Sequence, residues 1–293
     1  MMKKTGIIQK HTAAIKTRQT IFFALSLLVL VSIYPEVSLA QGGLLITPRR
    51  IVFDGTKNTQ QLNLANTGQD TASFAISLIQ YRMKENGSFE QITEADSGQY
   101  FADNYLRMYP RSVTLAPGEA QLIKVQLKNY RKLDNGEYRS HIYFRSITDT
   151  KPLGEEDIQA DTTSLSVRLI PIFGISIPAI IRKGKSNTEV ALTDISVSML
   201  NDTTPVLNIK LNRSGNMSVY GDIEVDYVSE DSKTKQVGLV RGLAVYTPNT
   251  VRYFQLKLDN SIDYNKGELH IVYKTKSDLK MKTLADEELI LHN

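Results

Sequence analysis

The chain has 293 residues, 35 of them Lys or Arg and 31 Asp or Glu, and it has no cysteine. Residues 1–40 hold five of the basic residues and one acidic residue, so residues 41–293 carry 30 of each sign and no net charge. Because they show no basic excess, we exclude nucleic-acid binding. Without disulfides, stability must come from hydrophobic cores, and the length suffices for two domains.

Residues 1–40 are predicted to be a secretion signal that is removed. An apolar stretch, Ile21–Ile33, is followed by Ser38-Leu39-Ala40, which offers small residues for cleavage. The basic residues that precede the stretch are Lys3, Lys4, Lys10, Lys16 and Arg18. The alternative is an uncleaved membrane anchor, but 13 residues at about 1.5 Å each fall short of a ~30 Å hydrocarbon core. We therefore expect an exported protein without stable membrane insertion after cleavage.

The rest of the chain alternates polar and apolar residues with a period of two, which predicts half-buried strands. The clearest such segments are Gln61–Asn66, Gln121–Leu127, Leu207–Leu211 and Asp222–Val228. Turn-forming residues separate them at Asn86-Gly87, Ala116-Pro117-Gly118, Asn135-Gly136, Ser214-Gly215 and Thr247-Pro248-Asn249. Short strands with frequent turns indicate an all-β fold of antiparallel sandwiches.

A domain boundary is predicted at Arg182–Asn187, after the long apolar segment Leu165–Ile181. We expect two tandem immunoglobulin-like β-sandwiches, residues 41–183 and 186–293. Within the first domain, Thr148–Thr163 is polar and acidic and contains a proline and a glycine. This composition predicts a loop between two strands of that domain.

The sequence contains no set of residues that indicates catalysis, a metal site or a cofactor. His141, His270 and His292 lie far apart and lack a ligand spacing. No Gly-x-Ser-x-Gly elbow and no phosphate-binding glycine loop are present. Asp222, Glu224 and Asp226 share one strand face, where a solvated polar surface is favoured over a cation site or paired acids. The tyrosines Tyr81, Tyr100, Tyr105 and Tyr109 are assigned to core and edge positions rather than to a sugar site.

Four segments, in order, give the first half a resemblance to the PapD-like periplasmic pilus chaperones. The first is Arg50-Ile51-Val52-Phe53-Asp54-Gly55, which is similar to that family's first-strand motif with its arginine. The others are Thr114–Glu119, similar to a leucine-x-proline-glycine turn, Gly136–Phe144, similar to the strand before the exposed edge, and Ile177-Pro178-Ala179-Ile180, similar to the exit into the second domain. The resemblance covers about residues 44–183.

The resemblance implies two immunoglobulin-like domains in an L-shaped arrangement and a function without catalysis. Such a chaperone adds its edge strand to a pilus or fimbrial subunit that lacks its last strand. It caps and stabilises that subunit in the periplasm and delivers it to an outer-membrane usher. Subunit and usher are therefore the expected partners, and the sequence leaves open whether the free protein forms a self-dimer that hides its edge.

The same resemblance assigns roles to individual residues. Arg50 would hold the C-terminal carboxylate of the subunit, because a guanidinium group binds a carboxylate through two hydrogen bonds. Leu165, Val167 and Leu169 alternate with polar residues and would form the apolar face of the donated strand. The other interpretation places these three in the core of their own domain, and Arg50, like Arg49, on the surface.

The sequence departs from the family pattern at two places. The family has a lysine shortly before the proline of the exit motif, where this chain has Phe173 or Gly174. Arg168 is the only base in that strand and a candidate substitute. Arg139 lies near a position that is usually acidic. The missing lysine supports the alternative of a structural or adhesive cell-surface protein made of immunoglobulin-like domains.

Overall fold

The computed structural model describes residues 43–147, 172–277 and 280–292, and within them the chain is all-β. The described regular elements other than strands are two short 3-10 helices, Asp103–Tyr105 and Tyr130–Lys132. The strands are β1 (Leu44–Thr47), β2 (Ile51–Phe53), β3 (Thr59–Asn66), β4 (Ala72–Met83), β5 (Phe89–Ile92), β6 (Leu106–Tyr109), β7 (Ser112–Leu115), β8 (Ala120–Leu127), β9 (Gly136–Ile147), β10 (Gly174–Lys183), β11 (Glu189–Leu200), β12 (Thr204–Ser214), β13 (Val219–Val228), β14 (Thr234–Val245), β15 (Val251–Lys257), β16 (Gly267–Ser277) and β17 (Lys280–Leu291).

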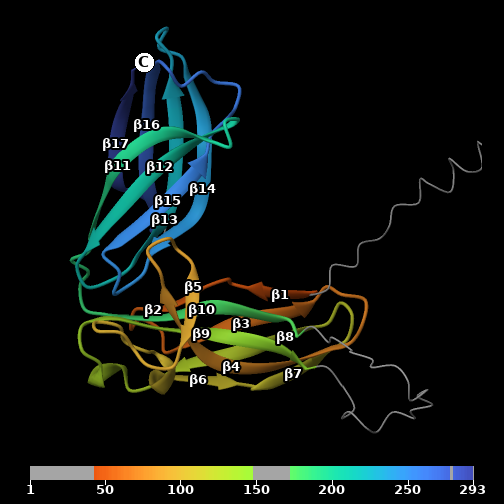
Figure 1. Cartoon of the computed structure of the whole chain (residues 1–293). Coiled ribbons are helices and arrows are strands. Elements are labelled where there is room, and N and C mark those ends of the chain that lie inside the picture. Colours follow the sequence, from red (N-terminus) through yellow and green to blue (C-terminus); the bar gives the residue numbers. More distant parts are fainter. Residues whose placement is uncertain (1–42, 148–171, 278–279, 293) are drawn as a thin grey trace, which may run out of the picture. The chain divides into compact units, whose positions relative to one another are not determined.

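Strands β1 to β10 form the first sandwich (Figure 1). One sheet has the order β1-β3-β8-β6, and the other has the order β2-β10-β9-β4-β5 with β7 also paired to β4. The inward residues of both sheets make one core, because period-two alternation turns one side of every strand toward it. Its fully buried members include Phe53, Leu62, Leu64, Leu115, Ile123, Ile142 and Phe144.

Strands β11 to β17 form the second sandwich from a sheet of order β11-β12-β15 and a sheet of order β14-β13-β16-β17 (Figure 1). Its core is separate from the first and includes Leu207, Leu211, Ile223, Val225, Leu269, Ile271 and Tyr273. Tyr273 is the largest fully buried side chain of the described residues, and its hydroxyl group donates to the backbone carbonyl of Leu243 at 2.8 Å. Each sandwich therefore buries an apolar core of its own.

The prediction of an all-β chain with two tandem sandwiches is confirmed. The alternating segments lie inside β3, β8, β12 and β13. The predicted domain limits, 41–183 and 186–293, stay a proposal. The predicted signal peptide, the Thr148–Thr163 loop and the segment from Leu165 to Leu169 lie outside the described residues. Within the described residues, no helix is both long and apolar enough to span a membrane.

A hairpin of the first sandwich also contacts the second. It connects β4 to β5, and the backbone N–H of Tyr253 donates to the carbonyl of Glu85 at 2.7 Å. The side-chain amide of Asn249 donates to the carbonyl of Met83, also at 2.7 Å. At the turn, Gly87 has a φ of +82°, a conformation that favours glycine.

Candidate functional site

Arg50 directly precedes β2, and the pairing of that strand decides which face of the sheet it occupies. β2 runs parallel to β10, with Ile51 opposite Ala179. Ile51 and Phe53 are buried in the first core. Because side chains alternate along a strand, Arg50 belongs to the opposite face of the sheet. Its neighbour Arg49 is exposed, as a surface residue would be.

Arg139 of β9 lies on the same face of this sheet as Arg50. The register places Val52 beside Ile180 and Ile180 beside Arg139, so the three residues form one row across β2, β10 and β9. Only 7% of Arg139 is exposed, and 5% of His141, two residues further along. Tyr220 contacts Arg50, and Tyr246 contacts Arg139 and His141. We call these five residues the arginine layer: Arg50, Arg139, His141, Tyr220 and Tyr246.

Within the arginine layer, Arg50 is a partly buried cation, and one of its N–H groups has no hydrogen-bond acceptor among the described residues. Its Cζ atom lies 4.2 Å from the centroid of the Tyr220 ring, a cation–π distance. Its Nε atom is buried and has no hydrogen-bond partner among the described residues. Burial, together with the guanidinium groups of Arg182 and Arg139, lowers the pKa of Arg50. An incoming carboxylate would relieve both the missing hydrogen bond and the repulsion between cations.

Next to this layer, Glu137 is a buried acid whose hydrogen-bonding capacity is filled. It forms ion pairs with Arg139 and with Nε of Arg182 at 3.0 Å. It also accepts hydrogen bonds from Ser218, at 3.1 Å from the backbone N–H and 2.7 Å from the hydroxyl group. Burial alone would raise the pKa of Glu137, but Arg139, Arg182 and Ser218 outweigh it and lower the pKa to about 2. The buried acid that pairs with Arg139 is therefore Glu137, two residues before it on β9.

Arg139 has more donors than its neighbours can use. Its Nη2 atom donates to Glu137 and, at 2.6 Å, to the hydroxyl group of Ser218. Its Nε and Nη1 atoms are buried without a partner among the described residues. The guanidinium group stacks on Tyr246, with Cζ 3.2 Å from the ring centroid. Arg139 and Arg182 thus share one carboxylate, and Arg50 has no ion pair in the described part of the chain, which leaves an excess of positive charge.

The edge of β10 lies beside this layer. On one side β10 pairs with β9 along its whole length, from Gly174 to Lys183. On the other side, the described residues pair only at Ala179–Ile181, where β2 runs beside it. From Gly174 to Pro178 the described structure therefore offers a row of backbone groups without a neighbouring strand, which is where another strand can add.

Apolar side chains accompany this open edge. Ile172 is 57% exposed, Phe173 43% and Ile175 37%. A groove of about 300 Å³ runs between β1 and the first half of β10. Its lining residues are Leu44, Leu45, Ile46, Arg49, Ile175, Ser176 and Ile177. A partner strand placed here would find both backbone groups and an apolar surface.

The site residues predicted from sequence fall into two groups. Arg50 lies in the arginine layer, whereas Arg168, Leu165, Val167 and Leu169 lie outside the described residues, so their roles stay predictions. Sequence reasoning did not assign Arg139 to the site with Arg50. The signal was present in the strand pattern, because Glu137, Arg139 and His141 alternate with Tyr138, Ser140 and Ile142. Only the register of β2, β10 and β9, however, shows that these residues share a sheet face with Arg50.

Comparisons with known proteins give a structural likeness alone. No protein-family model matches the chain, and no curated protein matches it. Among solved structures, the chain is similar to the YadV chaperone, with 11% sequence identity and a TM-score of 0.41, covering 85% of this chain and 100% of that one. It is similar to the Pseudomonas aeruginosa CupB2 chaperone, with 11% identity and a TM-score of 0.40, covering 84% and 100%. For the E. coli chaperone DraB the values are 13% identity and a TM-score of 0.39, covering 85% and 96%.

Proposed function

We propose that this chain is a non-catalytic periplasmic chaperone that caps pilus or fimbrial subunits. It adds its β10 edge strand to a subunit that lacks a strand, keeps the subunit soluble, and delivers it to an outer-membrane usher. The observation that carries the proposal is the open edge at Gly174–Pro178, beside the cation of Arg50. An exposed edge with apolar side chains is an aggregation hazard for an isolated protein and useful for one that pairs with an incomplete sheet.

In this proposal Arg50 binds the C-terminal carboxylate of the subunit. The carboxylate fills the unused hydrogen-bonding capacity of the guanidinium group and fixes the register of the added strand. Leu165, Val167 and Leu169 of the preceding segment enter the groove of the subunit. A hydrogen bond to a charged group contributes about 1.5–3 kcal/mol, so loss of Arg50 should weaken binding roughly ten- to a hundredfold.

Arg139 is our candidate for the second base, in place of Arg168. It lies on the same sheet face as Arg50 and has two buried donors without a partner in the described structure. Tyr246 stacks on its guanidinium group, so a carboxylate reaches Arg139 only when the Tyr246 ring moves. Arg139→Lys retains the charge and should keep more subunit binding than Arg139→Gln.

The test is recovery of a one-to-one complex with a subunit from the periplasm of cells that export the chain. Arg50→Gln and Ile175→Asp should each lower recovery at least tenfold, because they remove the anchor and an exposed apolar contact beside the edge. Matched controls lie on the other sheet: Arg107→Gln and Leu122→Asp change exposed residues of β6 and β8 and should leave recovery unchanged.

Two results would contradict the proposal. One is a subunit complex that Arg50→Gln and Ile175→Asp leave intact, which would remove the roles of the anchor and of the edge. The other is recovery of the chain only as surface-bound polymers of itself that are insensitive to both changes. That second result would favour the structural or adhesive cell-surface protein.

A further inference from the structure

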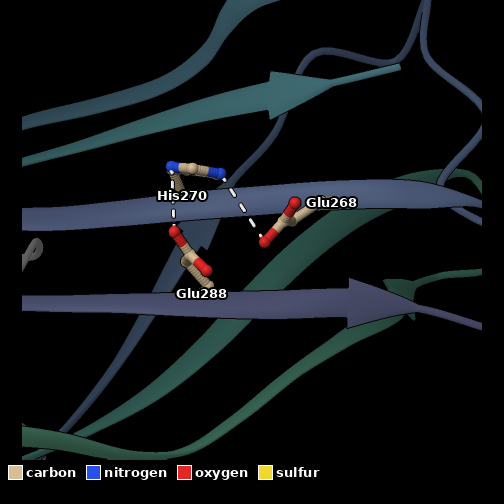
Figure 2. Close-up of side chains that lie close together, drawn as sticks. All are labelled: Glu268, His270 and Glu288. Carbon is tan, nitrogen blue, oxygen red and sulfur yellow. Dashed lines mark ion pairs between the residues drawn. The ribbon is translucent and has the colours of Figure 1, made fainter. Parts of the chain in front are cut away.

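A histidine beside two carboxylates lies on the outer face of the second sandwich, away from the arginine layer. Glu268 and His270 are two residues apart on β16, so they share one face of the sheet. Glu288 of β17 stands directly opposite His270 in the antiparallel register. Figure 2 shows both carboxylates on one side of the imidazole ring, with a dashed line from each ring nitrogen to one of them.

The distances within this cluster are close to those of a metal site. His270 Nε2 lies 3.6 Å from Glu268 Oε1, and His270 Nδ1 lies 3.6 Å from Glu288 Oε1. One ligand atom from each of the three residues fits within 4.8 Å of the other two. Zn²⁺ binds nitrogen and oxygen at about 2.0–2.2 Å, which places tetrahedral ligands roughly 3.4 Å apart. Ligand atoms that are 4.8 Å apart must therefore approach by about 1.4 Å, and both glutamates have partly exposed side chains that can rotate.

The surrounding charges also favour a cation. Asp226 of β13 pairs with His270 on the side opposite Glu288, and Asp286 of β17 pairs with Val272, the next residue on this face of β16. Among the described residues, neither aspartate forms an ion pair, whereas the nearby Glu224 is paired with Lys274.

We infer that Glu268, His270 and Glu288 bind a divalent first-row transition-metal ion such as Zn²⁺, with water completing the coordination. One imidazole with carboxylates suits Zn²⁺, Co²⁺ or Ni²⁺ better than Mg²⁺ or Ca²⁺, which take oxygen ligands alone. The ion would use one ring nitrogen and join the last two strands of the sheet, because Glu288 comes from β17 and the other two ligands come from β16.

The test is titration of the tag-free chain with ZnSO4 at neutral pH by calorimetry. One equivalent should bind, and His270→Ala and Glu288→Gln should each weaken binding at least tenfold. Glu287→Gln is the matched control, because Glu287 is the neighbouring residue on the opposite face of β17 and should leave binding unchanged. His292→Ala tests whether the exposed histidine after β17 binds the ion instead.

A second measurement does not depend on affinity alone. Co²⁺ bound to the wild-type chain should give visible d–d absorption bands that His270→Ala abolishes. The inference is overturned if the wild-type chain binds no Zn²⁺ at about 1 mM, or if His270→Ala binds as tightly as the wild type. In either case the cluster is only a histidine paired with two acids, and the proposed chaperone function is unaffected.

Discussion

Glu137 is the residue on which the arginine layer depends most, because it is the one carboxylate shared by Arg139 and Arg182. Glu137→Gln would leave the buried cation of Arg139 and the partly exposed cation of Arg182 without their counter-charge, and we expect the free energy of unfolding to fall by about 3–5 kcal/mol at pH 7. Urea unfolding followed by circular dichroism measures this. The control is Glu90→Gln, in an exposed pair with Lys84, where the loss should be far smaller because solvent screens the pair. A similar loss for both variants would contradict the prediction.

His141 makes the stability of the chain depend on pH. Burial, and to a lesser degree Arg139, lowers the pKa of His141 from 6.5 to about 3. Below pH 6.5 the unfolded chain therefore binds a proton that the folded chain does not bind, so stability is lost as the pH falls from 6.5 toward 3. Between pH 7 and pH 5 the loss should be about 2 kcal/mol.

This loss can be assigned by substitution. His141→Phe should remove it, because the ring already packs edge-on against Tyr81 at a centroid distance of 4.9 Å and a phenyl group has no charge to bury. His292→Gln, at an exposed position, should retain it. Urea unfolding of the three proteins at pH 7 and pH 5 makes the comparison. An equal pH dependence in His141→Phe and in the wild-type chain would show that other groups are responsible.

Ile175 and Ile177 are neighbours on one face of β10, but only Ile177 is buried. Ile177 is 4% exposed and belongs to the first core, whereas Ile175 is 37% exposed beside the open edge. We expect Ile177→Ala to lower the free energy of unfolding by about 2–5 kcal/mol. Ile175→Ala should lower it by less than about 1 kcal/mol, because little buried surface is lost. Chemical denaturation of both variants checks this, and equal losses would mean that the edge is covered in solution.

Single strands could be predicted from the sequence, whereas clusters of side chains from different strands could not. Strands such as β3 and β8 could be predicted because alternation is local, as in Gln61–Asn66. The arginine layer could not, because Arg50 and Arg139 are brought together by the register of β2, β10 and β9. The pair Glu268 and His270 was visible in the sequence, but Glu288 joins it only through pairing between strands. The sequence analysis assigned the histidines no ligand role because they lie far apart and lack a ligand spacing.

At the scale of the whole molecule, the two cores are separate but polar contacts connect the sandwiches. Ser218 of the second sandwich bonds to Glu137, and Tyr253 and Asn249 bond to the hairpin between β4 and β5. We expect one calorimetric unfolding transition for residues 41–293. The separate fragments 41–183 and 186–293 should each fold but unfold at lower temperature, since each loses these contacts. Two transitions in the intact chain, at the temperatures of the fragments, would contradict this.

Arg139 and Arg182 share the carboxylate of Glu137, and this sharing restricts which substitutions related sequences can accept. Loss of Glu137 alone leaves the buried Arg139 and the partly exposed Arg182 without a counter-charge, and loss of Arg182 alone leaves the acid with fewer partners. Either single step is costly, whereas replacing the whole set by apolar residues of similar volume is tolerated far better. Descendants of this chain should therefore keep Glu137, Arg139, Arg182 and Ser218 together or lose them together, which would appear as covariation among positions far apart in the sequence.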